Sequence, residues 1–419
     1  MTLATTTARE RMLLAKDAAR QIALLDDARK SRLLRAMADA IEAATVDVVA
    51  ANVQDLERGR ASGLSSALQD RLTLDAGRVA ALAAAVREVA DLPDPVGRVI
   101  EQRTLENGLE LTKLAVPFGV VGSIYEARPN VTVDIAALAL RSGNAVVLRG
   151  GTAAELTNAA LVRAMRDALA AEGIDPEAVQ TLDEFGRAGA KELMQARGIV
   201  DVLVPRGSAQ LIETVVTESV VPVIETGAGV VHVYLDASAP LERSRDIVVN
   251  AKAQRPSVCN AAETVLVHAE AADRIVGPVV AALQAAGVTV HGDDEVARRA
   301  EGVVPADETD WATEYLSLDI AMRVVDDLDD ALAHIRRYST HHTESIITDD
   351  DRATERFLAE VDSAVVMANA STRFTDGGEF GFGAEVGIST QKLHARGPMG
   401  LRELTSTKWV VRGAGQVRG

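Results

Sequence analysis

The sequence predicts an α/β protein with two parallel-sheet domains and a projecting β-hairpin arm. Three observations lead to this fold class: a helical opening, then two alternating runs joined by a turn, and then repeated alternation of short apolar runs with helical segments. Strands that alternate with helices of this length imply parallel sheets with crossover helices. With 419 residues, 47% of them apolar, the chain can form two or three domains with substantial cores.

Composition excludes several classes of protein. Lys plus Arg number 44 against 61 Asp plus Glu, so the net charge is −17. This excess argues against a nucleic-acid surface, and aromatic residues at 3% show no base-stacking pattern. The N-terminus has no apolar signal-like segment, and no run approaches the ~18 apolar residues of a membrane span. We therefore expect a cytoplasmic protein with no nucleic-acid or membrane partner.

The first part of the chain is predicted to be helical. Apolar residues recur near the helical period over residues 7–45, and the pattern continues over residues 46–56 and 65–89. Pro93 and Pro95 then break it. The opening therefore predicts a set of amphipathic helices that ends before the first strand.

A hairpin is predicted next, over residues 97–116. Its two alternating runs meet at Asn107-Gly108, the pair favoured in a two-residue type I′ turn. The alternation leaves one face polar, as on a projecting arm. The short run at residues 407–412 predicts a final strand that can pair with this hairpin.

Strands and helices then alternate in two successive regions. The first region predicts strands at residues 117–125, 145–148, 201–204 and 221–224, with helices at residues 153–171 and 209–217. The second predicts strands at residues 230–236, 263–268, 320–325, 345–348 and 364–367, with a helix at residues 329–338. Parallel sheets of this kind bind nucleotides at the carboxyl ends of their strands.

Two loops at strand ends have suitable chemistry for a nucleotide. They are Arg149-Gly150-Gly151 and Arg206-Gly207-Ser208. Glycine allows close approach of a ligand, arginine offers a planar cation, and Ser208 is a candidate helix cap whose neighbouring amides can face an anion. Each loop alone is more often an ordinary capped turn. Together, at neighbouring strand ends, they favour a dinucleotide site.

The only cysteine, Cys259, is the candidate nucleophile. A lone thiol cannot form an internal disulfide or a multi-cysteine metal site, so it is either a small buried apolar residue or a reactive group. Lys252 and Arg255 precede it, and Pro256-Ser257 suits a turn that enters a helix. Nearby cations and a helix N-terminus both favour a thiolate. The apolar run at residues 263–268 predicts a core strand that anchors this loop.

The histidines predict no metal site. His232 alternates into an apolar strand, where a satisfied core histidine is the simplest interpretation. Only His341-His342 are close in sequence, and adjacent side chains on an extended segment point in opposite directions.

Four parts of the chain carry a resemblance to known proteins. They are Pro117-Phe-Gly-Val-Val-Gly122 with Tyr125-Glu-Ala-Arg-Pro-Asn-Val-Thr132, Gly143-Asn-Ala-Val-Val-Leu-Arg-Gly-Gly151, Gln254-Arg-Pro-Ser-Val-Cys-Asn260 and Gly387-Ile-Ser-Thr-Gln-Lys-Leu-His-Ala-Arg-Gly-Pro-Met-Gly400. These segments resemble the aldehyde dehydrogenase superfamily and, within it, the family of γ-glutamyl phosphate reductases. The similarity covers nearly the whole chain.

The resemblance implies an aldehyde dehydrogenase-like fold with three regions. Residues 1–232 are expected to form a cofactor-binding domain that carries the oligomerisation arm at residues 97–116. Residues 233–372 are expected to form the catalytic domain, and residues 373–419 a return segment with the oligomerisation strand.

The resemblance also assigns roles to single residues. It implies that Cys259 is the nucleophile, Asn130 the oxyanion donor and Glu314 the carboxylate that holds the nicotinamide ribose. Arg149 stands where relatives have a lysine near the adenosine ribose. Arginine there is compatible with a 2′-phosphate, and the family generally uses NADPH.

The implied reaction is NADPH-dependent reduction of L-glutamyl 5-phosphate to L-glutamate 5-semialdehyde and phosphate, through a cysteine thioester, in proline biosynthesis. Candidate groups for the phosphate or the α-carboxylate are Lys252, Arg255, Ser257 and Arg373. The resemblance further implies a homodimer or a dimer of dimers, and it leaves open an association with glutamate 5-kinase.

Three other functions remain to be weighed. A hydrolytic aldehyde dehydrogenase is one, but Glu225-Thr-Gly-Ala-Gly229 lacks the leucine and paired glycines that set the water-activating glutamate in such enzymes. An inactive scaffold of the same fold is disfavoured by Cys259 and Glu314. A cysteine hydrolase without a nucleotide is disfavoured because no histidine is evidently paired with the cysteine.

Overall fold

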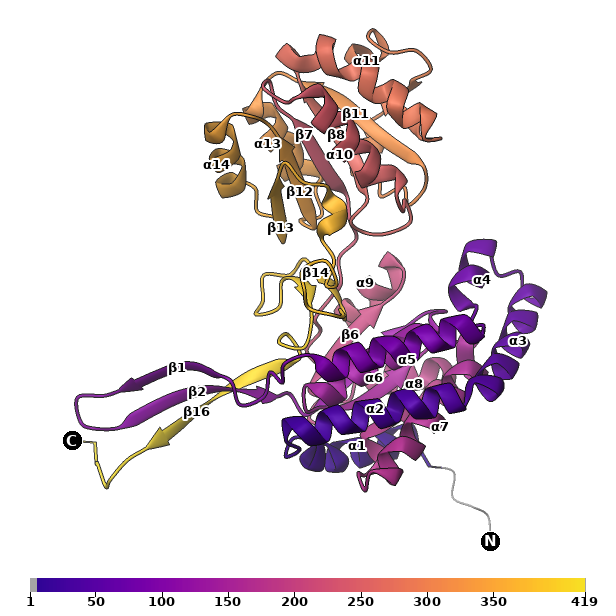
Figure 1. Cartoon of the computed structure of the whole chain (residues 1–419), viewed down its shortest axis with the longest axis vertical. Coiled ribbons are helices and arrows are strands. Elements are labelled where there is room, and N and C mark those ends of the chain that lie inside the picture. Colours follow the sequence, from indigo (N-terminus) through magenta and orange to yellow (C-terminus); the bar gives the residue numbers. More distant parts are fainter. Residues whose placement is uncertain (1–5, 419) are drawn as a thin grey trace. The chain divides into compact units, whose positions relative to one another are not determined.

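The computed structural model describes residues 6–418, apart from the side chains of Ser66 and Ala67. The chain divides into two compact units (Figure 1). Unit 1 comprises Met1–Glu225, Gly381–Gly387 and Met399–Gly419, and unit 2 comprises Thr226–Phe380 and Ile388–Pro398. Each unit therefore has its own sheet and its own core.

The domain limits differ from those predicted. The chain enters unit 2 at Thr226 rather than after residue 232, because β7 (Val231–Leu235) pairs with β8 (Ala262–His268) in the unit 2 sheet. The predicted return segment, residues 373–419, is shared between the two units. It contains η5 (Thr372–Phe374), β14 (Gly387–Ser389) and β15 (Gly397–Met399).

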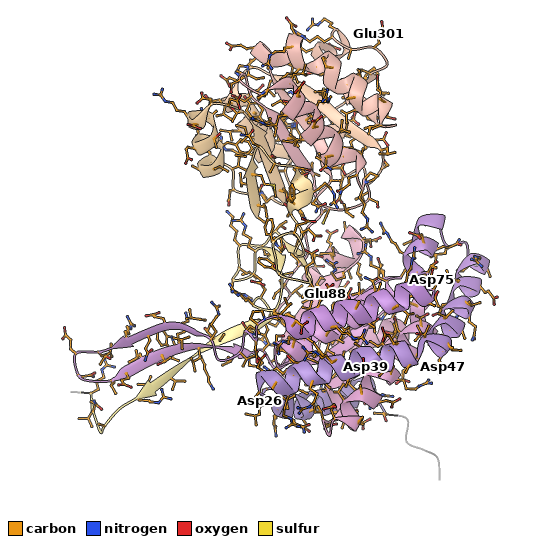
Figure 2. All side chains as sticks on the ribbon, in the orientation of Figure 1. Asp26, Asp39, Asp47, Asp75, Glu88 and Glu301 are labelled. Atoms are coloured by element: carbon orange, nitrogen blue, oxygen red, sulfur yellow. The ribbon has the colours of Figure 1, made fainter. Side chains whose placement is uncertain are left out.

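Unit 1 opens with amphipathic helices, as predicted. Asp26 and Asp75, marked in Figure 2, cap two of them by accepting backbone N–H groups of the first turn. Leu33, Met37 and Ile41 recur at helical spacing and are fully buried. The helices are α1 (Ala8–Ile22), α2 (Asp27–Ala43), α3 (Thr45–Ala61), α4 (Ser66–Leu72) and α5 (Ala76–Asp91).

The sheet of unit 1 is parallel, with the order β5-β4-β3-β6. Its strands are β3 (Val120–Tyr125), β4 (Ala145–Arg149), β5 (Val179–Thr181) and β6 (Val202–Arg206). The connections contain α6 (Pro129–Arg141), η1 (Thr152–Ala154), α7 (Glu155–Ala171), η2 (Pro176–Ala178), η3 (Asp183–Phe185), α8 (Gly186–Met194) and α9 (Ala209–Glu218). Because the strands are parallel, the loops after Tyr125, Arg149 and Arg206 share one edge.

The predicted strand at residues 221–224 is wrong. Val223 forms only an isolated bridge with Leu203, whose N–H donates to Pro222 O and whose carbonyl accepts from Ile224 N. Pro222 has no N–H of its own, so it interrupts a regular ladder.

The predicted arm is a three-stranded antiparallel sheet in the described chain, with the order β1-β2-β16 (Figure 1). The strands are β1 (Val99–Thr104), β2 (Glu110–Pro117) and β16 (Thr405–Arg412). Pairing of β16 with β2 from Thr405↔Pro117 to Arg412↔Glu110 confirms the predicted partner of the hairpin. The predicted type I′ turn is wrong, because φ is positive at Gly108 (+83°) but not at Asn107. Leu105 and Leu109 close a longer loop instead.

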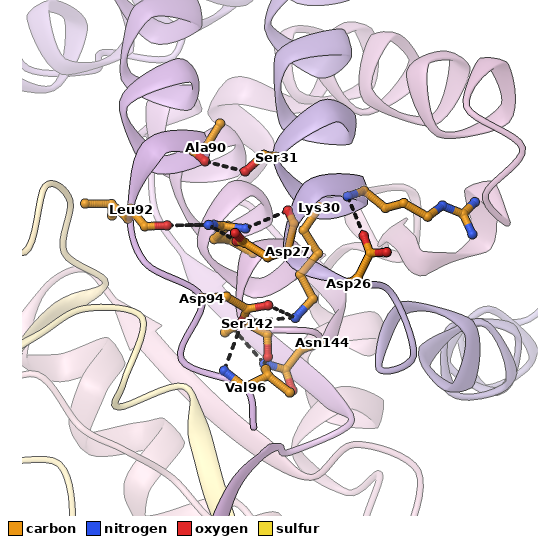
Figure 3. A network of polar contacts seen from close by, with 12 residues as sticks. Asp26, Asp27, Lys30, Ser31, Ala90, Leu92, Asp94, Val96, Ser142 and Asn144 are labelled. Carbon is orange, nitrogen blue, oxygen red and sulfur yellow. Dashed lines mark hydrogen bonds and ion pairs between the residues drawn. The ribbon is translucent and has the colours of Figure 1, made fainter. Parts of the chain in front are cut away.

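Buried polar groups fix the base of the arm (Figure 3). Lys30 Nζ donates to Asp94 Oδ2 at 2.8 Å, and Asp94 Oδ1 accepts from the Val96 N–H at 2.9 Å. Asn144 Nδ2 donates to the Leu404 carbonyl at 2.9 Å, directly before β16. These bonds hold the first and last strands of the arm to the helices and sheet of unit 1.

The sheet of unit 2 is also parallel, with the order β10-β9-β11-β8-β7-β12-β13. Its further strands are β9 (Thr289–Gly292), β10 (Val304–Pro305), β11 (Asp319–Val325), β12 (Thr343–Ile347) and β13 (Val365–Ala368). The connections contain α10 (Leu241–Ala253), α11 (Ala269–Ala285), α12 (Asp294–Ala297), η4 (Asp310–Ala312), α13 (Leu328–Tyr338) and α14 (Asp351–Glu360). Among residues 6–418, no helix combines the length and the apolar character needed to cross a bilayer.

Both faces of this sheet are covered, so its central strands β7 and β8 are buried along almost their whole length. Along β8, Val265 and Val267 pack into the core formed with α10 and α11, whereas Leu266 packs into the core formed with α13 and α14 (Figure 1). Alternate residues of a strand point to opposite faces. The loop that precedes β8 is therefore attached to the most deeply buried part of unit 2.

Candidate active site

Cys259 lies in unit 2, on the loop between the end of α10 at Ala253 and the start of β8 at Ala262. Its side chain is partly buried. The expected helix after Pro256 is absent from this loop, which continues through turns directly into β8. The predicted core strand is confirmed, but a helix N-terminus does not contribute to the setting of the thiol.

The backbone of Cys259 is in close contact with Gly229. A Cβ atom placed on Gly229 would lie 1.6 Å from the Cys259 carbonyl oxygen. The Gly229 N–H in turn donates to Glu314 Oε1 at 2.7 Å. Glu314 and the cysteine loop, which the sequence separates widely, are thus joined through one glycine.

The next residue, Asn260, fastens the cysteine loop to the segment around η5. Its Nδ2 donates to the Thr375 carbonyl at 2.7 Å, and its own carbonyl accepts from Thr372 Oγ1 at 2.7 Å. Sequence reasoning missed this role of Asn260, because its partners are far along the chain and no local pattern connects them.

Arg373 contacts the start of the cysteine loop. Its Nε donates to Gln254 Oε1 at 2.9 Å. Burial lowers the pKa of Arg373, and the positive charge of Arg255 lowers it further. The negative charges of Asp376 and Cys259 act in the opposite direction and raise this pKa. Arg373 is therefore close enough to Arg255 and to Cys259 to interact electrostatically with each of them. Ser257 lies in the same loop and is exposed.

The prediction that Lys252 binds substrate is wrong. Lys252 is fully buried in the last turn of α10, and its Nζ is paired with Glu263 Oε2 at 2.5 Å. A side chain without exposed surface cannot contact a substrate carboxylate or phosphate directly. Glu263, the second residue of β8, is equally buried.

Unit 1 carries the predicted cofactor loops at one edge of its sheet. Arg149 Nε donates to the Gly186 carbonyl at 3.2 Å, and the Gly150 N–H donates to Asp183 Oδ1 at 2.6 Å. A Cβ on Gly150 would lie 2.2 Å from Asn158 Nδ2, so this position requires glycine. The Arg149 loop is thus held in one conformation, with its guanidinium directed toward α8.

A buried network of polar side chains is hydrogen-bonded to this loop through Asp183. Tyr125 Oη and Thr132 Oγ1 are 2.6 Å apart, and Thr132 donates to Asn158 Oδ1 at 2.9 Å. Asn158 Nδ2 donates to Asp183 Oδ2 at 2.8 Å. Burial raises the pKa of Asp183, whereas the bonds from Asn158 and the Gly150 amide lower it. No local sequence pattern predicts these hydrogen bonds, because the four side chains come from separate elements.

In the loop after β6, the expected anion site is occupied by a side chain of the protein itself. Ser208 Oγ caps α9 by accepting from the Leu211 N–H at 3.3 Å, as predicted. Its own N–H, however, donates to Glu126 Oε2 at 3.1 Å. Gly207 permits this approach, since a Cβ there would lie 2.8 Å from the same oxygen. A carboxylate of the chain therefore occupies the helix N-terminus that was expected to face a phosphate.

Asn130 lies in the first turn of α6, in unit 1, and is exposed. Its Nδ2 donates to Asp134 Oδ2 at 3.2 Å. Burial raises the pKa of Asp134 to about 6, while this bond and the charge of Arg206 lower it. The structure thus places Asn130 and Arg206 at the same edge of unit 1. One hydrogen of the Asn130 side-chain amide is bound to Asp134.

The fold and these loops define a class of protein. A family model described as "Aldehyde dehydrogenase family" matches residues 3–300. The chain is 65% identical to the gamma-glutamyl phosphate reductase of Clavibacter michiganensis subsp. michiganensis, over 97% of this chain and 94% of the relative. It is 62% identical to the gamma-glutamyl phosphate reductase of Leifsonia xyli subsp. xyli, over 98% of this chain and 97% of the relative.

Solved structures agree. The crystal structure of gamma-glutamyl phosphate reductase from Thermotoga maritima matches with a TM-score of 0.96 and 42% identity, over 98% of this chain and 100% of that one. The chain therefore belongs to the aldehyde dehydrogenase family and, within it, to the γ-glutamyl phosphate reductases, which are glutamate-5-semialdehyde dehydrogenases. The family and the fold class predicted from the sequence are confirmed.

Proposed function

We propose that the enzyme reduces L-glutamyl 5-phosphate to L-glutamate 5-semialdehyde and phosphate in proline biosynthesis, with NADPH as reductant and Cys259 as nucleophile. The observation that carries the proposal is the placement of the only thiol beside Gly229 and Arg373, in a chain 65% identical to a protein named gamma-glutamyl phosphate reductase. The substrates are small molecules, and the proposed setting is the cytoplasm.

The first step is acyl transfer to sulfur. The Cys259 thiolate attacks the acyl carbon of the glutamyl phosphate, an S–C bond forms, and the C–O bond to phosphate breaks with its electron pair leaving on phosphate. The Cys259 amide and Asn130 are the proposed donors to the tetrahedral oxyanion. Arg255 and Arg373 favour the thiolate by their charge and, with Ser257, bind the phosphate or the α-carboxylate.

The second step releases the aldehyde. NADPH supplies a hydride when it is bound. The thioester carbon accepts it, the resulting thiohemiacetal collapses, and sulfur leaves again as the thiolate. Glu314 is proposed to hold the ribose next to the nicotinamide.

The residues of unit 1 fit a dinucleotide. The Gly150 position has room for a backbone but not for a side chain, and Arg149 is held at the edge of the sheet by Gly186. We propose that Arg149 and Gly150, with Arg206, Gly207 and Ser208 on the neighbouring loop, hold the adenosine and phosphate part of NADPH. Any phosphate at Ser208 must displace the Glu126 carboxylate.

One assay separates this function from hydrolytic aldehyde oxidation. Glutamate 5-semialdehyde, NADP⁺ and inorganic phosphate are mixed with the enzyme, and formation of NADPH is followed by absorbance. We expect turnover that depends on phosphate. Sustained turnover without phosphate would instead indicate a hydrolytic dehydrogenase.

Arg149→Ala is expected to weaken NADPH binding by about tenfold or more, and NADH binding much less. Only NADPH offers a 2′-phosphate to the guanidinium, and a hydrogen bond to a charged group contributes ~1.5–3 kcal/mol. Dissociation constants of both cofactors, measured by calorimetry, test this. Arg163→Ala, which removes an exposed arginine on α7, is the matched control. Equal losses for both cofactors would show that Arg149 binds another part of the ligand.

We also propose that the arm forms a homodimer or a dimer of dimers. On the arm, Trp409 is 44% and Val411 54% exposed, and every residue of β1 is exposed. A small sheet with apolar surface and an open edge needs a cover, and a symmetric dimer provides one.

Deletion of residues 407–419 is therefore expected to give a monomeric or aggregating protein. The deletion removes most of β16 and exposes the edge of β2. Sedimentation velocity measures the result. Deletion of residues 413–419 alone leaves β16 intact and is expected to keep the assembly of the full chain. A well-behaved, equally stable dimer after the longer deletion contradicts the proposed interface.

A further inference from the structure

The buried pair of Lys252 and Glu263 lies in unit 2. Its two residues stand on either side of the cysteine loop in the sequence, at the end of α10 and the start of β8. Both side chains have no exposed surface, and their charged atoms are 2.5 Å apart. A buried ion pair generally adds little stability over apolar residues of similar size. Stability of the core therefore does not account for these two charges, and their remaining contacts indicate what they do.

Glu263 holds a strained turn through its second oxygen. Its Oε1 accepts from the Leu316 N–H at 3.3 Å. Leu316 has a φ of +55°, a left-handed conformation that residues with a side chain adopt only when their surroundings enforce it. Lys252 Nζ lies 5.8 Å from the centre of the Tyr315 ring, over its face. The pair thus fixes the two residues that follow Glu314.

Glu314 itself points back to the cysteine loop. Its Oε1 accepts from the Gly229 N–H at 2.7 Å, and Gly229 packs against the Cys259 carbonyl. Burial raises the pKa of Glu314, whereas the Gly229 amide and the charge of Lys252 lower it. Burial likewise raises the pKa of Glu263, to about 7, and Lys252 opposes this rise. Lys252 is thus a cation that acts on the buried Glu263 and on the partly buried Glu314.

We propose that Lys252 and Glu263 are positioning residues that keep Glu314 directed toward the nicotinamide ribose of the bound cofactor. Glu263 sets the turn at Leu316, and Lys252 supplies the compensating charge. This inference rests on the proposed function, because the contact between Glu314 and the ribose belongs to that proposal.

The first test compares NADPH affinity in three variants by calorimetry. Lys252→Met combined with Glu263→Leu removes both members of the fully buried pair, so that neither is left without the other, and is expected to keep the melting temperature near that of the parent enzyme. Its Kd for NADPH is expected to rise at least about tenfold, while KM for glutamate 5-semialdehyde changes little. Glu314→Ala is expected to show a similar loss. Lys30→Met with Asp94→Leu removes another buried pair, in unit 1, and is expected to leave NADPH affinity unchanged.

The second test is the pH dependence of NADPH binding in Lys252→Met. Without this cation Glu314 takes up its proton at higher pH, and a protonated carboxyl loses acceptor capacity. The pH at which affinity falls on acidification is therefore expected to move upward relative to the parent enzyme. The charged and titratable groups around Lys252 are Glu263, Glu314, Tyr315 and Asp319. His291 and Asp310 lie next to Tyr315.

The outcomes are distinguishable. Weaker NADPH binding in both Glu314→Ala and the Lys252/Glu263 double variant, with the upward pH shift, supports the inference. Weaker binding in Glu314→Ala alone overturns it and leaves the proposed function in place. Unchanged binding in Glu314→Ala overturns the ribose contact on which both proposals depend. An unshifted pH profile in Lys252→Met overturns the role of Lys252 as the compensating charge.

Discussion

Cys259→Ser is expected to lower turnover by more than about a hundredfold while NADPH affinity stays nearly unchanged. Serine is a far weaker nucleophile near neutral pH without a paired base, and a hundredfold loss corresponds to ~2.7 kcal/mol in the barrier. Steady-state rates and calorimetric NADPH binding measure the two effects separately. Retention of more than about one hundredth of the parent rate contradicts the role of Cys259 as nucleophile.

Gly229→Ala is expected to have an effect of similar size, through the backbone rather than through the thiol. A Cβ atom 1.6 Å from the Cys259 carbonyl oxygen cannot be accommodated, so either the cysteine loop or the Gly229 amide must move. The first movement displaces Sγ, and the second breaks the hydrogen bond to Glu314. We expect turnover to fall at least about a hundredfold, since small misplacements of reacting groups are costly.

Gly77→Ala serves as the matched control for this variant. Gly77 lies in the first turn of α5, where the nearest atom to an added Cβ is a side-chain oxygen of Asp75 at 3.3 Å, far from the 1.6 Å found at Gly229. Alanine is expected to be tolerated there, with unchanged turnover and a melting temperature at or above that of the parent enzyme. If Gly229→Ala behaves in the same way, the close contact between Gly229 and the cysteine loop has no catalytic importance.

Much of the architecture is predictable from the period of the apolar residues. Alternation between strands and helices gave the parallel sheets of both units, and residues 407–412 were correctly expected beside the hairpin. The errors lie where a single residue determines the local backbone conformation or its hydrogen bonding. Pro222 interrupts a strand-like run, and Asn107 does not adopt the positive φ that its type I′ turn would require.

The site was predictable only in part, because its contacts join distant segments. Arg255 and Arg373 were candidates for binding the phosphate or the α-carboxylate, and both act on the same part of unit 2 as Cys259, since Arg255 lowers the pKa of Arg373 and Cys259 raises it. Lys252 was wrongly expected to bind the substrate, because it is fully buried. The helical spacing that buries Val248 and Ala251 also turns Lys252 inward, and Glu263 stands in an apolar strand. A lysine and a glutamate that each interrupt an apolar pattern are candidates for a buried pair, a signal present in the sequence.

At Ser208 the sequence correctly predicted a position that favours a negative group, but not the source of that group. A Gly-Ser sequence before a helix predicts a site for a negative group, and the structure does place one there. The negative group is the carboxylate of Glu126, which follows a different strand of the sheet. Local sequence indicates that an anion is favourable at a helix N-terminus, but not whether the protein or a ligand supplies it.

The central claim, a thioester on Cys259, is tested most directly by the mass of the enzyme in a half-reaction. The enzyme is mixed with glutamate 5-semialdehyde and NADP⁺ without phosphate, quenched in acid, digested and analysed by mass spectrometry. We expect one equivalent of NADPH per active site and a glutamyl adduct on the peptide that contains Cys259, which disappears when phosphate is added before quenching. NADPH formation with an unmodified Cys259 peptide, or an adduct on another residue, would contradict the account.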